Sequence, residues 1–460
     1  RLRFAIEIVQ AIKESCGKDF PVSLRYSIKS FIKDWKSGGL PGEEFLEKGR
    51  DIEEGIEAAK ILEEAGYDAF NGDVGSYDSW YWSHPPMYQE KGLYLPYNAI
   101  LKKILKVPVI TAGRMENPDL ASDAIEQGKT DMIALGRPLL ADSEIPNKIM
   151  SDRYDKIRPC LSCQEGCMGR LASFATISCA VNPACGRENE YGLQPASESK
   201  TVMIIGGGVA GCEAARVCAI RGHKVTLFEK TDKLGGNIIP GGVPDFKEDD
   251  RELARWYTAE LNDLKVTLRF NTEVTKEIVK ETNAAVVIVA TGSIPKMLKI
   301  GHANNVYTAE EVLLGKKAAG NSTIIIGGGL VGCETALWLA DQGKQVTLVE
   351  MQNDILKIGG PLCHANEDML RDLLKFKKID VRLNTVVAGA TANGFLLKSG
   401  SKEESVVADS AIVSIGYNSE RSLYDEIKFN VPQIYLLGDA NQVQNIMYAI
   451  WNAYEVARNI

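Results

Sequence analysis

An internal repeat constrains the fold of this chain more than any other feature of its sequence. The segment VMIIGGGVAGCEAARVCAIRGHKVTLFEK, which begins at Val202, aligns without a gap with TIIIGGGLVGCETALWLADQGKQVTLVEM, which begins at Thr323. Each copy has an apolar run, a G-x-G-x-x-G motif that opens a helix-length segment, and a second apolar run that ends in an acid. This order is typical of a dinucleotide-binding βαβ unit. The sequence therefore predicts an α/β protein with two such units in tandem.

The glycines and the acid of each copy have separate tasks in such a unit. The first glycine permits a tight turn, the second lets the backbone approach a pyrophosphate, and the third lets the helix pack closely on the strand. The pyrophosphate lies at the helix N-terminus, and the acid suits ribose hydroxyls. The predicted nucleotide-binding residues are Gly206, Gly208, Gly211 and Glu229 in the first copy, and Gly327, Gly329, Gly332 and Glu350 in the second.

Three motifs near the copies resemble those of the two-dinucleotide flavoprotein disulfide reductases, a glutathione reductase-like pair of Rossmann domains. They are LGGN (Leu234–Asn237), ATGSIP (Ala290–Pro295) and LGDA (Leu437–Ala440). The resemblance implies that the first copy holds FAD and that the second, inserted copy binds NAD(P)H. It adds these residues to the predicted FAD site, with Asp439 near the ribityl and pyrophosphate groups: Gly236, Ala290, Thr291, Gly292, Gly438 and Asp439.

The second copy favours NADH over NADPH. A carboxylate at Glu350 repels a 2′-phosphate, and residues Met351–Asp354 provide no arginine to receive one. We therefore expect NADH to be the nucleotide of this site.

Four cysteines with a regular spacing indicate a metal centre. They follow the pattern C-x2-C-x3-C-x11-C and are Cys160, Cys163, Cys167 and Cys179. Three thiolates within eight residues suit three corners of one [4Fe–4S] cubane, and the following loop supplies the fourth ligand. A structural zinc site, which usually has two C-x2-C knuckles, and a set of buried unliganded thiols are the alternatives. Cys185 falls outside the pattern.

Residues 1–155 alternate between helix and strand. We expect helices at 1–16, 43–65, 97–105, 117–127 and 143–152, and strands at 21–27, 67–73, 107–113 and 132–138. Four βα units joined by short loops are typical of a parallel sheet, and a closed (β/α)₈ TIM barrel has eight strands. This segment is therefore predicted to be half of a TIM barrel. Because the sequence begins without Met inside an amphipathic pattern, we expect it to be a fragment of a longer polypeptide.

Several residues at the ends of these strands are candidates for an active site. TIM barrels place active sites at the C-terminal ends of strands, with phosphate sites after strands 7 and 8. The last two predicted strands end in Gly113-Arg114 and Gly136-Arg137, in which glycine permits close backbone approach and arginine pairs with an anion. Arg25 is a candidate to stabilise charge that develops on a flavin ring. Exposed salt bridges are the alternative for these arginines.

The loop after the second predicted strand is rich in aromatic residues. It reads DVGSYDSWYWSHPP, from Asp73 to Pro86, and contains His84. Such a loop can stack on a flat substrate and offer a proton-transfer group at His84. The alternative is a hydrophobic loop that packs on its neighbours.

Composition excludes some classes of partner. A net charge of −8 argues against nucleic acid or an anionic membrane as the main partner. The apolar runs are strand-length, far short of the roughly 18 residues that a membrane span needs. Scattered cysteines in apolar contexts favour a reducing, cytoplasmic location, and a homo-oligomer stays open.

The order of the segments and several motifs resemble the 2-enoate reductase and 2,4-dienoyl-CoA reductase family of old yellow enzyme-like flavoproteins. The motifs SLRYS, ITAGR, ALGRPLLAD and SCAVNP carry the resemblance together with the cysteine run, and it covers all 460 residues. The stretch from YSIKSFIKDW to GLYLPYN is most similar to the 2-enoate (cinnamate-type) reductases of anaerobes.

The resemblance implies a set of cofactors and residue roles. FMN lies in the barrel, with Arg25 at the flavin ring and both Arg114 and Arg137 at the phosphate. The [4Fe–4S] cluster lies between FMN and FAD, and His84 lies near the substrate. The proton-donor tyrosine of the family belongs to the first half of the barrel, which this sequence does not contain.

The predicted organisation and reaction follow from the resemblance. The second half of the FMN barrel occupies 1–155, the cluster segment 156–192, the FAD domain 200–312 with 409–460, and the NAD(H) domain 313–408.

The implied activity is NADH-dependent reduction of the C=C bond of α,β-unsaturated carboxylates or their thioesters, with electrons passing from NADH through FAD, cluster and FMN. The alternatives are an amine dehydrogenase of the trimethylamine dehydrogenase type and an NADH-oxidising electron-transfer module that serves a partner. The sequence does not fix which enoate is used.

Overall fold

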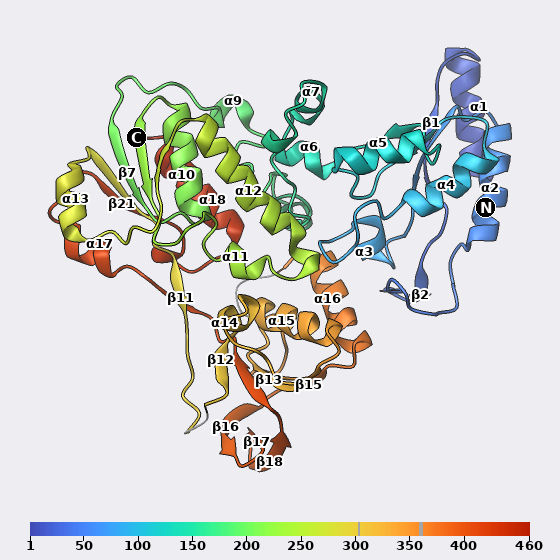
Figure 1. The fold of residues 1–460 in the computed structure, drawn as a ribbon. Coiled ribbons are helices and arrows are strands. Elements are labelled where there is room, and N and C mark those ends of the chain that lie inside the picture. Colours follow the sequence, from blue (N-terminus) through green and yellow to red (C-terminus); the bar gives the residue numbers. More distant parts are fainter. Residues whose placement is uncertain (302–303, 358–361) are drawn as a thin grey trace. The chain divides into compact units, whose positions relative to one another are not determined.

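The computed structural model describes residues 1–301, 304–357 and 362–460 and divides into two compact units (Figure 1). The first unit is Arg1–Tyr154 and the second is Asp155–Ile460. Among the described residues, no helix is long and apolar enough to cross a membrane.

The first unit, which is described throughout, is built on a four-stranded parallel sheet in the order β1-β4-β5-β6. Its strands are β1 (Ser23–Ser27), β4 (Ala69–Asp73), β5 (Val109–Thr111) and β6 (Met132–Ile133), and a separate ribbon pairs β2 (Ile32–Asp34) with β3 (Ser37–Gly38). Its helices are α1 (Arg3–Cys16), α2 (Ile52–Glu64), α3 (Trp80–Ser83), α4 (Leu95–Ile104), α5 (Pro118–Glu126), α6 (Arg137–Ala141) and α7 (Ile145–Met150). The strands lie in chain order with helical crossovers, which confirms the predicted half-barrel topology.

The helix expected at 43–65 is wrong over its first turns, because α2 begins only at Ile52. Asp51 caps this helix by accepting a hydrogen bond from the Glu54 N–H at 2.8 Å. The preceding residues run beside β2 instead: the Glu47 carboxylate accepts from the Ile32 N–H at 2.8 Å. Gly49 packs closely there, since a Cβ on it would lie 2.5 Å from that of Ser30.

The strand expected at 132–138 is also too long. It ends at Ile133, and α6 begins at Arg137 with Pro138 in its first turn. Proline favours the first helical turn, where its missing N–H removes no hydrogen bond.

The second unit contains, among its described residues, two five-stranded parallel sheets. The first has the order β21-β10-β7-β8-β9, and the second has the order β12-β19-β13-β14-β15. The strands of the first sheet are β7 (Thr201–Ile205), β8 (Lys224–Phe228), β9 (Thr267–Arg269), β10 (Val286–Val289) and β21 (Ile434–Leu436). Those of the second are β12 (Val306–Thr308), β13 (Ser322–Ile326), β14 (Gln345–Val349), β15 (Asp380–Arg382) and β19 (Ser410–Val413).

Smaller elements complete this unit. The remaining strands are β16 (Val386–Thr391), β17 (Gly394–Ser399) and β18 (Lys402–Val407) in one antiparallel sheet, and β11 (Ser293–Pro295) paired with β20 (Tyr417–Ser419). The helices are α10 (Val209–Ile220), α11 (Ile238–Gly241), α12 (Glu248–Asp263), α13 (Lys276–Thr282), α14 (Ala309–Leu313), α15 (Leu330–Asp341), α16 (His364–Phe376), α17 (Ser422–Ile427) and α18 (Ile446–Ala457). The cysteine segment carries η1 (Tyr154–Lys156), η2 (Glu165–Gly169), α8 (Arg170–Ala172) and α9 (Glu188–Tyr191), and single turns lie at η3 (Asp245–Lys247) and η4 (Gly438–Ala440).

The strand order moves the expected boundaries of the NAD(H) domain. Both β12 and β19 hydrogen-bond within the second sheet, although they lie outside 313–408. The inserted domain therefore begins before Val306 and ends after Val413. The chain enters this domain after β11 and leaves it at β20, and these two strands pair antiparallel.

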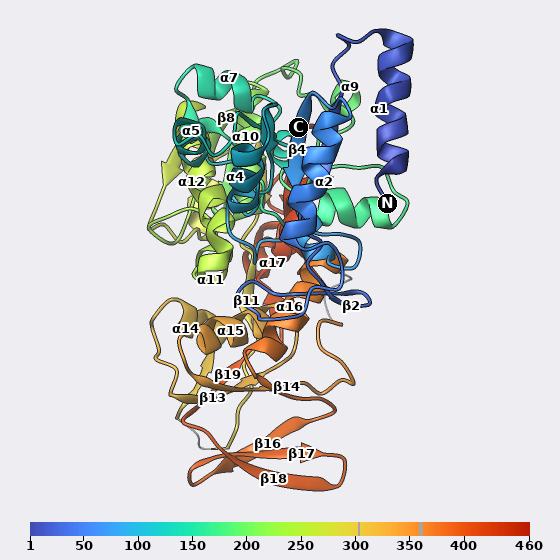
Figure 2. The same ribbon diagram turned by 90° about the vertical axis from the view of Figure 1, so that its right-hand side faces the viewer.

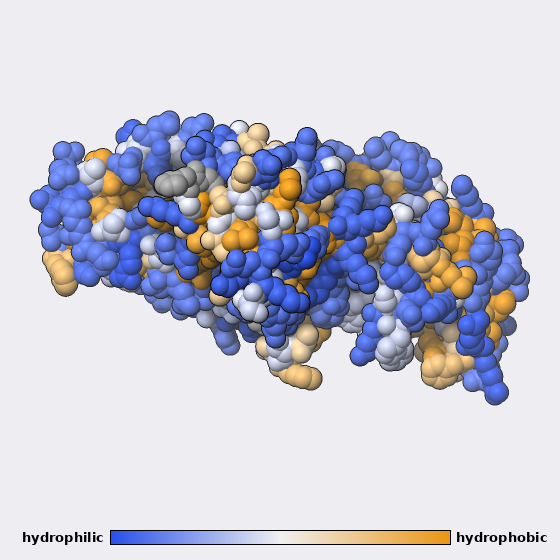
Figure 3. All heavy atoms as spheres, turned by 90° about the horizontal axis from the view of Figure 1, so that it is seen from below, coloured by the Kyte–Doolittle hydropathy of each residue, from blue (hydrophilic) through white to orange (hydrophobic). Residues whose placement is uncertain are grey.

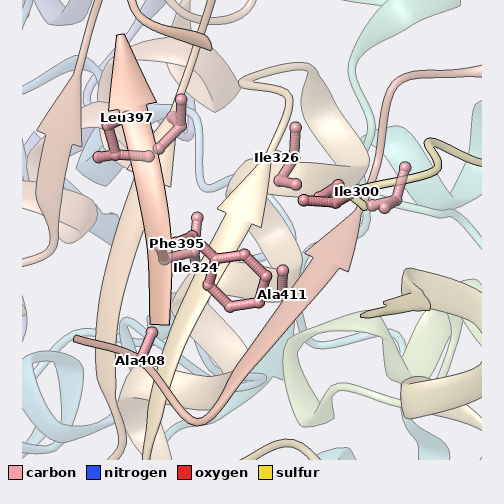
Figure 4. Close-up of a cluster of buried hydrophobic side chains, with 9 residues drawn as sticks. Ile300, Ile324, Ile326, Phe395, Leu397, Ala408 and Ala411 are labelled. Carbon is pink, nitrogen blue, oxygen red and sulfur yellow. The ribbon is translucent and has the colours of Figure 1, made fainter. Parts of the chain in front are cut away.

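The β16–β18 sheet packs on the second five-stranded sheet: Figure 1 shows it beside β13, and Figure 2 shows it beside β13 and β14. Phe395 and Leu397 of β17 contact Ile324 and Ile326 of β13 in a buried apolar cluster (Figure 4). Phe395 is fully buried. On the face of the molecule shown in Figure 3, hydrophilic and hydrophobic residues are interspersed.

Candidate active site and cofactor sites

The two arginines that follow the last strands of the first unit have different surroundings. Arg114 is 8% exposed, and its Nη1 donates hydrogen bonds to the carbonyls of Met87, at 3.0 Å, and Gln89. Gly113 packs on an aromatic ring, since a Cβ there would lie 2.5 Å from Cγ of Tyr94. The contacts of this pair of residues are therefore with the protein's own loop.

Gly136 and Arg137 instead provide open space and a hydrogen-bond donor for a ligand. No atom outside the adjacent residues lies within 4 Å of the position that a Cβ on Gly136 would take. Nη1 of Arg137 is buried and has no hydrogen-bond partner in the part of the chain that the structure describes. A buried guanidinium nitrogen normally has a hydrogen-bond partner, so this position fits an anion such as a phosphate.

Arg25 lies on β1 next to the end of β4. Its Nε is 2.7 Å from Oδ2 of Asp73, and its Nη1 donates to Oδ1 of Asn71 at 2.5 Å. Burial raises the pKa of the Asp73 carboxyl, and the Arg25 charge opposes that rise. The Arg25 side chain is 49% exposed, so its free edge is accessible for a further contact.

The aromatic loop divides into a buried part and an exposed part. Tyr81 and Trp82 are buried, and they donate to the carbonyls of Gly38 and Gly39, both at 2.6 Å. Trp82 also stacks on Phe31 with ring centroids 3.7 Å apart. For these two residues, the alternative of packing on neighbours is correct.

Tyr77, Trp80 and His84 form a separate stack. The Trp80 and His84 rings lie 4.2 Å apart at 16°, and the Tyr77 and Trp80 rings lie 5.2 Å apart at 26°. Tyr77 is 85% exposed, and His84 Nδ1 lies 3.2 Å from the Ser83 hydroxyl. The stack fixes the plane of the imidazole and presents a flat aromatic surface.

The four cysteines of the spaced pattern lie near one another. Burial raises the pKa of the Cys163 thiol well above its usual range, and the neighbouring Cys160 and Cys179 raise it further. The same effects raise the pKa of the Cys179 thiol to about 12. Main-chain N–H groups point at both sulfurs and favour their thiolates, from Glu165 to Cys163 and from Val181 to Cys179. Buried thiols with donors of this kind are typical ligands of iron–sulfur clusters.

The backbone brings the two halves of the pattern together. The π-helical turn η2 carries Cys167, and Gly166 before it lies against the backbone of Cys179. A Cβ on Gly166 would lie 2.8 Å from Cα of Cys179. The loop can therefore close only with glycine at this position.

The cysteine pattern supplies four thiols from one segment of the chain. Among the described residues, no three His, Cys, Asp or Glu side chains converge closely enough to hold one ion. Zinc draws four thiolates to about 2.3 Å from one centre, whereas a cubane spreads its four ligands over its corners. Four thiols, three of them within eight residues, match the ligand set that a [4Fe–4S] cluster uses.

The two glycine-rich turns have the same geometry. Gly206 and Gly327 have φ of 107° and 108°, which glycine adopts readily. A Cβ on Gly211 would lie 1.9 Å from the Gly206 carbonyl, and one on Gly332 would lie 1.9 Å from that of Gly327.

The middle glycines and the acids complete each site. A Cβ on Gly329 would meet no atom within 4 Å, and one on Gly208 only Gly236 at 3.9 Å, so both turns are open to a pyrophosphate. Glu229 accepts from the Gly207 N–H at 2.7 Å, and Glu350 accepts from the equivalent N–H in the second copy at 2.6 Å.

The three additional FAD motifs meet in one hydrogen-bond chain. Asn237 Nδ2 donates to the Ser293 hydroxyl at 3.2 Å, and this hydroxyl donates to Asp439 at 3.0 Å. Burial raises the pKa of the Asp439 carboxyl. Gly438 lies against α10, since a Cβ on it would be 2.7 Å from that of Ala210.

The remaining residues predicted for the FAD site lie on this side of the first sheet. Ala290 follows β10 directly, and its carbonyl lies close to Gly206. Thr291 and Gly292 are tied to the segment after β20: the Thr291 hydroxyl donates to the Glu420 carbonyl, and the Glu420 N–H donates to the Gly292 carbonyl at 2.9 Å.

Sequence reasoning missed two side chains that hold the cysteine segment. Trp451 of α18 donates to the Cys179 carbonyl, and Asn366 of α16 donates to the Cys163 carbonyl, each at 3.0 Å. These contacts join residues more than 200 positions apart, and no local pattern signals them.

Comparisons with known proteins match both units. Residues 1–156 match the NADH:flavin oxidoreductase / NADH oxidase family, and residues 200–455 match the pyridine nucleotide-disulphide oxidoreductase family. Cinnamate reductase from Clostridium sporogenes is 70% identical over 460 residues, which cover 100% of this chain and 69% of that protein. NADH oxidase from Thermoanaerobacter brockii is 35% identical, and the match covers 100% of this chain and 70% of that protein.

A solved structure agrees with the sequence relatives. The complex of 2-naphthoyl-CoA reductase with 2-naphthoyl-CoA has a TM-score of 0.90 at 30% identity, over 100% of this chain and 68% of that chain. The order of barrel, cysteine segment and two nucleotide-binding sheets is therefore that of a known type of flavoenzyme. This chain belongs to the 2-enoate reductase family of NADH-dependent flavoprotein oxidoreductases, with an FMN-type barrel unit and a unit that binds FAD and NAD(H).

Proposed function

We propose that this enzyme uses NADH to reduce the C=C bond of aryl-substituted 2-enoates such as cinnamate. The observation that carries the proposal is the 70% identity, over the whole chain, to a cinnamate reductase. The partly exposed aromatic stack of Tyr77, Trp80 and His84 supports an aryl substrate, because it offers aromatic surface beside a polar imidazole.

The cofactors supply the redox chemistry, and the chain positions them. When bound, FAD would supply hydride exchange with NADH, a [4Fe–4S] cluster would supply single-electron transfer, and FMN would supply hydride transfer to the substrate. Arg137 binds the FMN phosphate through the guanidinium nitrogen that has no partner within the described protein. Arg114 holds the loop of Met87 and Gln89 beside that site.

In the barrel unit, Arg25 acts on the flavin ring and His84 acts on the substrate. Arg25 is oriented by Asp73 and Asn71, and it stabilises negative charge on the flavin ring. His84 is held by the stack on Trp80, and it donates a hydrogen bond to the substrate carboxylate. Polarising the carbonyl lowers the electron density at the β-carbon, which favours hydride addition there.

In the second unit, the four cysteines hold the cluster and the two glycine-rich turns hold the dinucleotides. Cys160, Cys163, Cys167 and Cys179 are the cluster ligands. Gly206, Gly208 and Gly211 receive the FAD pyrophosphate, and Glu229 and Asp439 its sugar and ribityl groups. Gly327, Gly329 and Gly332 receive NADH, and Glu350 binds its ribose.

The second glycine-rich turn argues against an amine dehydrogenase. An enzyme that passes electrons from its cluster directly to a carrier protein does not need an NADH site, yet the second copy retains the turn geometry of the first. The 70% identity to a cinnamate reductase over the whole chain likewise argues against an electron-transfer module that only serves a partner.

We also propose a cytoplasmic enzyme whose partners are small molecules, with neither nucleic acid nor membrane as partner. The structure describes all ten cysteines, and none of them forms a disulfide, which is typical of a reducing compartment. Self-association into a homo-oligomer is compatible with this proposal and is measured by sedimentation.

Anaerobic turnover with NADH tests the proposed reaction. The holoenzyme is incubated with NADH and either cinnamate or a short alkyl enoate, and separately with dimethylamine and an electron-accepting dye. We expect 3-phenylpropanoate and NAD⁺ in equal amounts, slower turnover of the alkyl enoate, and no amine oxidation. Amine-dependent dye reduction without enoate reduction would refute the proposal.

A further inference from the structure

We propose that Trp451 and Asn366 are positioning residues that set the reduction potential of the iron–sulfur cluster. Each donates one side-chain N–H hydrogen bond to the main-chain carbonyl of a cluster ligand, Trp451 to Cys179 and Asn366 to Cys163, both at 3.0 Å. The two donors come from different nucleotide-binding domains. This inference rests on the proposed function, because it requires that these cysteines hold a cluster.

Trp451 connects the FAD domain to the cysteine segment. It lies on α18, the helix that follows the FAD-binding turn at Gly438. The guanidinium groups of Arg170 and Arg187 lie 5.4 Å and 5.5 Å from its ring centroid, and both arginines belong to the cysteine segment. The indole is therefore held by its ring as well as by its N–H.

Asn366 makes the equivalent contact from the NAD(H) domain. It lies in the first turn of α16 and is 4% exposed. Its Oδ1 is buried and has no hydrogen-bond partner in the described part of the protein. A buried amide oxygen without a hydrogen-bond partner lowers the stability of the fold. We infer that asparagine is nevertheless used at this position because its Nδ2 donates to the Cys163 carbonyl.

A second contact supports the role of α16. The main-chain N–H of Cys363, at the start of this helix, donates to the Glu165 carboxylate, which lies between two of the cluster cysteines. The Cys363 thiol also lies 3.6 Å from Oε1 of Gln164. The segment 163–165 is thus held at several points by one helix of the NAD(H) domain.

The two hydrogen bonds have a defined electrostatic effect. A carbonyl group presents the negative end of its dipole, and an N–H donor bound to it offsets part of that charge. Reduction adds negative charge to the cluster, so donors nearby favour the reduced form. Loss of either donor should therefore lower the reduction potential of the cluster.

The test compares three variants of the anaerobically purified holoenzyme. Trp451→Phe and Asn366→Leu remove the donors but keep the approximate size of the side chains. Trp256→Phe is the matched control, because Trp256 donates at 3.1 Å to the carbonyl of Lys156, which is no ligand, and has the Arg158 guanidinium 4.7 Å above its ring. Iron and acid-labile sulfide are quantified, and the cluster and FAD potentials are measured by redox titration with electron paramagnetic resonance and absorbance.

We expect full iron content and a lower cluster potential in both test variants, with an unchanged FAD potential. The expected shift is a threefold to tenfold change in the one-electron equilibrium constant, where tenfold corresponds to about 59 mV. The Trp256→Phe control should keep the wild-type potential. Loss of iron from the test variants but not from the control would also support a positioning role.

Two results would overturn the inference. The first is a wild-type cluster potential in both test variants, and the second is the same shift or the same iron loss in the control. A wild-type protein without iron and sulfide would instead refute the cluster of the proposed function, and this inference with it. The two failures are therefore distinguishable.

Discussion

Glu350, which we propose binds the NADH ribose, also has a structural task. One carboxylate oxygen accepts from the Gly328 N–H at 2.6 Å, and the other accepts from the Gln352 N–H at 2.7 Å. Glu229 makes the same pair of contacts in the first copy, with Gly207 at 2.7 Å and Thr231 at 2.8 Å. The acid at this position therefore stabilises the glycine-rich turn, in addition to its proposed contact with the ribose.

Replacing this acid should change the choice of nucleotide. Glu350→Ala combined with Met351→Arg removes the repulsion of a 2′-phosphate and adds a cation at a side chain that is 70% exposed. We expect the ratio of kcat/KM for NADPH to that for NADH to rise about tenfold to a hundredfold, because one charged hydrogen bond contributes about 1.5–3 kcal/mol. Met351→Arg alone is the control and should shift the ratio less. An unchanged ratio in the double variant would show that Glu350 does not distinguish the nucleotides.

A buried charge cluster should give the second unit a pH-dependent stability. Nζ of Lys247 lies 2.8 Å from Glu334 and 3.8 Å from Asp250. Burial raises the pKa of Asp250 to about 6, although Lys247 opposes the rise. Since the folded pKa exceeds the unfolded value of about 3.9, protonated Asp250 favours the folded state at low pH, and this contribution is lost as the pH rises through 6.

Asp250→Asn isolates that contribution. The wild-type free energy of unfolding should fall by up to about 3 kcal/mol relative to the variant between about pH 4 and pH 7. Urea denaturation at several pH values measures it, and exposed Asp425→Asn is the control. Parallel pH profiles for the wild type and Asp250→Asn would contradict this account.

At the scale of elements, the repeat and the βα alternation predict most of the architecture. Apolar runs such as β7 and β13 are buried almost throughout, so their pattern identifies them directly. The helix expected at 43–65 failed because side-chain contacts with β2 outweigh the local helical pattern before the Asp51 cap. The domain boundaries failed because β12 and β19 join their sheet through hydrogen bonds between distant segments.

The residues of the candidate site also divide into those that the sequence predicts and those that it does not. Glycine and cysteine motifs are local in sequence, so their spacing reveals them. The separate surroundings of Arg114 and Arg137 depend on which carbonyl groups lie nearby in space, and no spacing indicates those. The contact of Trp451 with Cys179 is beyond sequence reasoning for the same reason.

The two arginines should respond differently to substitution. Arg137→Met should raise the Kd for FMN about tenfold to a hundredfold with little change in Tm, because a charged phosphate contact contributes about 1.5–3 kcal/mol. Arg114→Met should lower Tm, because the buried carbonyls of Met87 and Gln89 lose their donor, at about 1–3 kcal/mol. Flavin fluorescence titration and thermal unfolding of the holoenzyme measure both effects. Equal FMN loss in the two variants, with neither Tm changed, would contradict the distinction.

At the scale of the molecule, the cysteine segment occupies a central place in the proposed electron path. It belongs to the second unit and is hydrogen-bonded there to α16 and α18, one helix from each nucleotide-binding domain. The first unit carries four of the eight strands that a closed barrel has. Assays of the complete reaction therefore require the polypeptide in which the barrel is closed.

In the proposed reaction, electrons pass from NADH to the enoate through the cysteine-bound cluster. The most direct measurement is the rate of NADH-driven cinnamate reduction by the Cys163→Ser holoenzyme, with NADH-dependent dye reduction recorded on the same sample. We expect cinnamate reduction to be abolished, while dye reduction, which needs only the FAD and NAD(H) domains, continues near the wild-type rate. Cinnamate reduction at a rate close to wild type would show that the cluster is not on the path and would contradict the account.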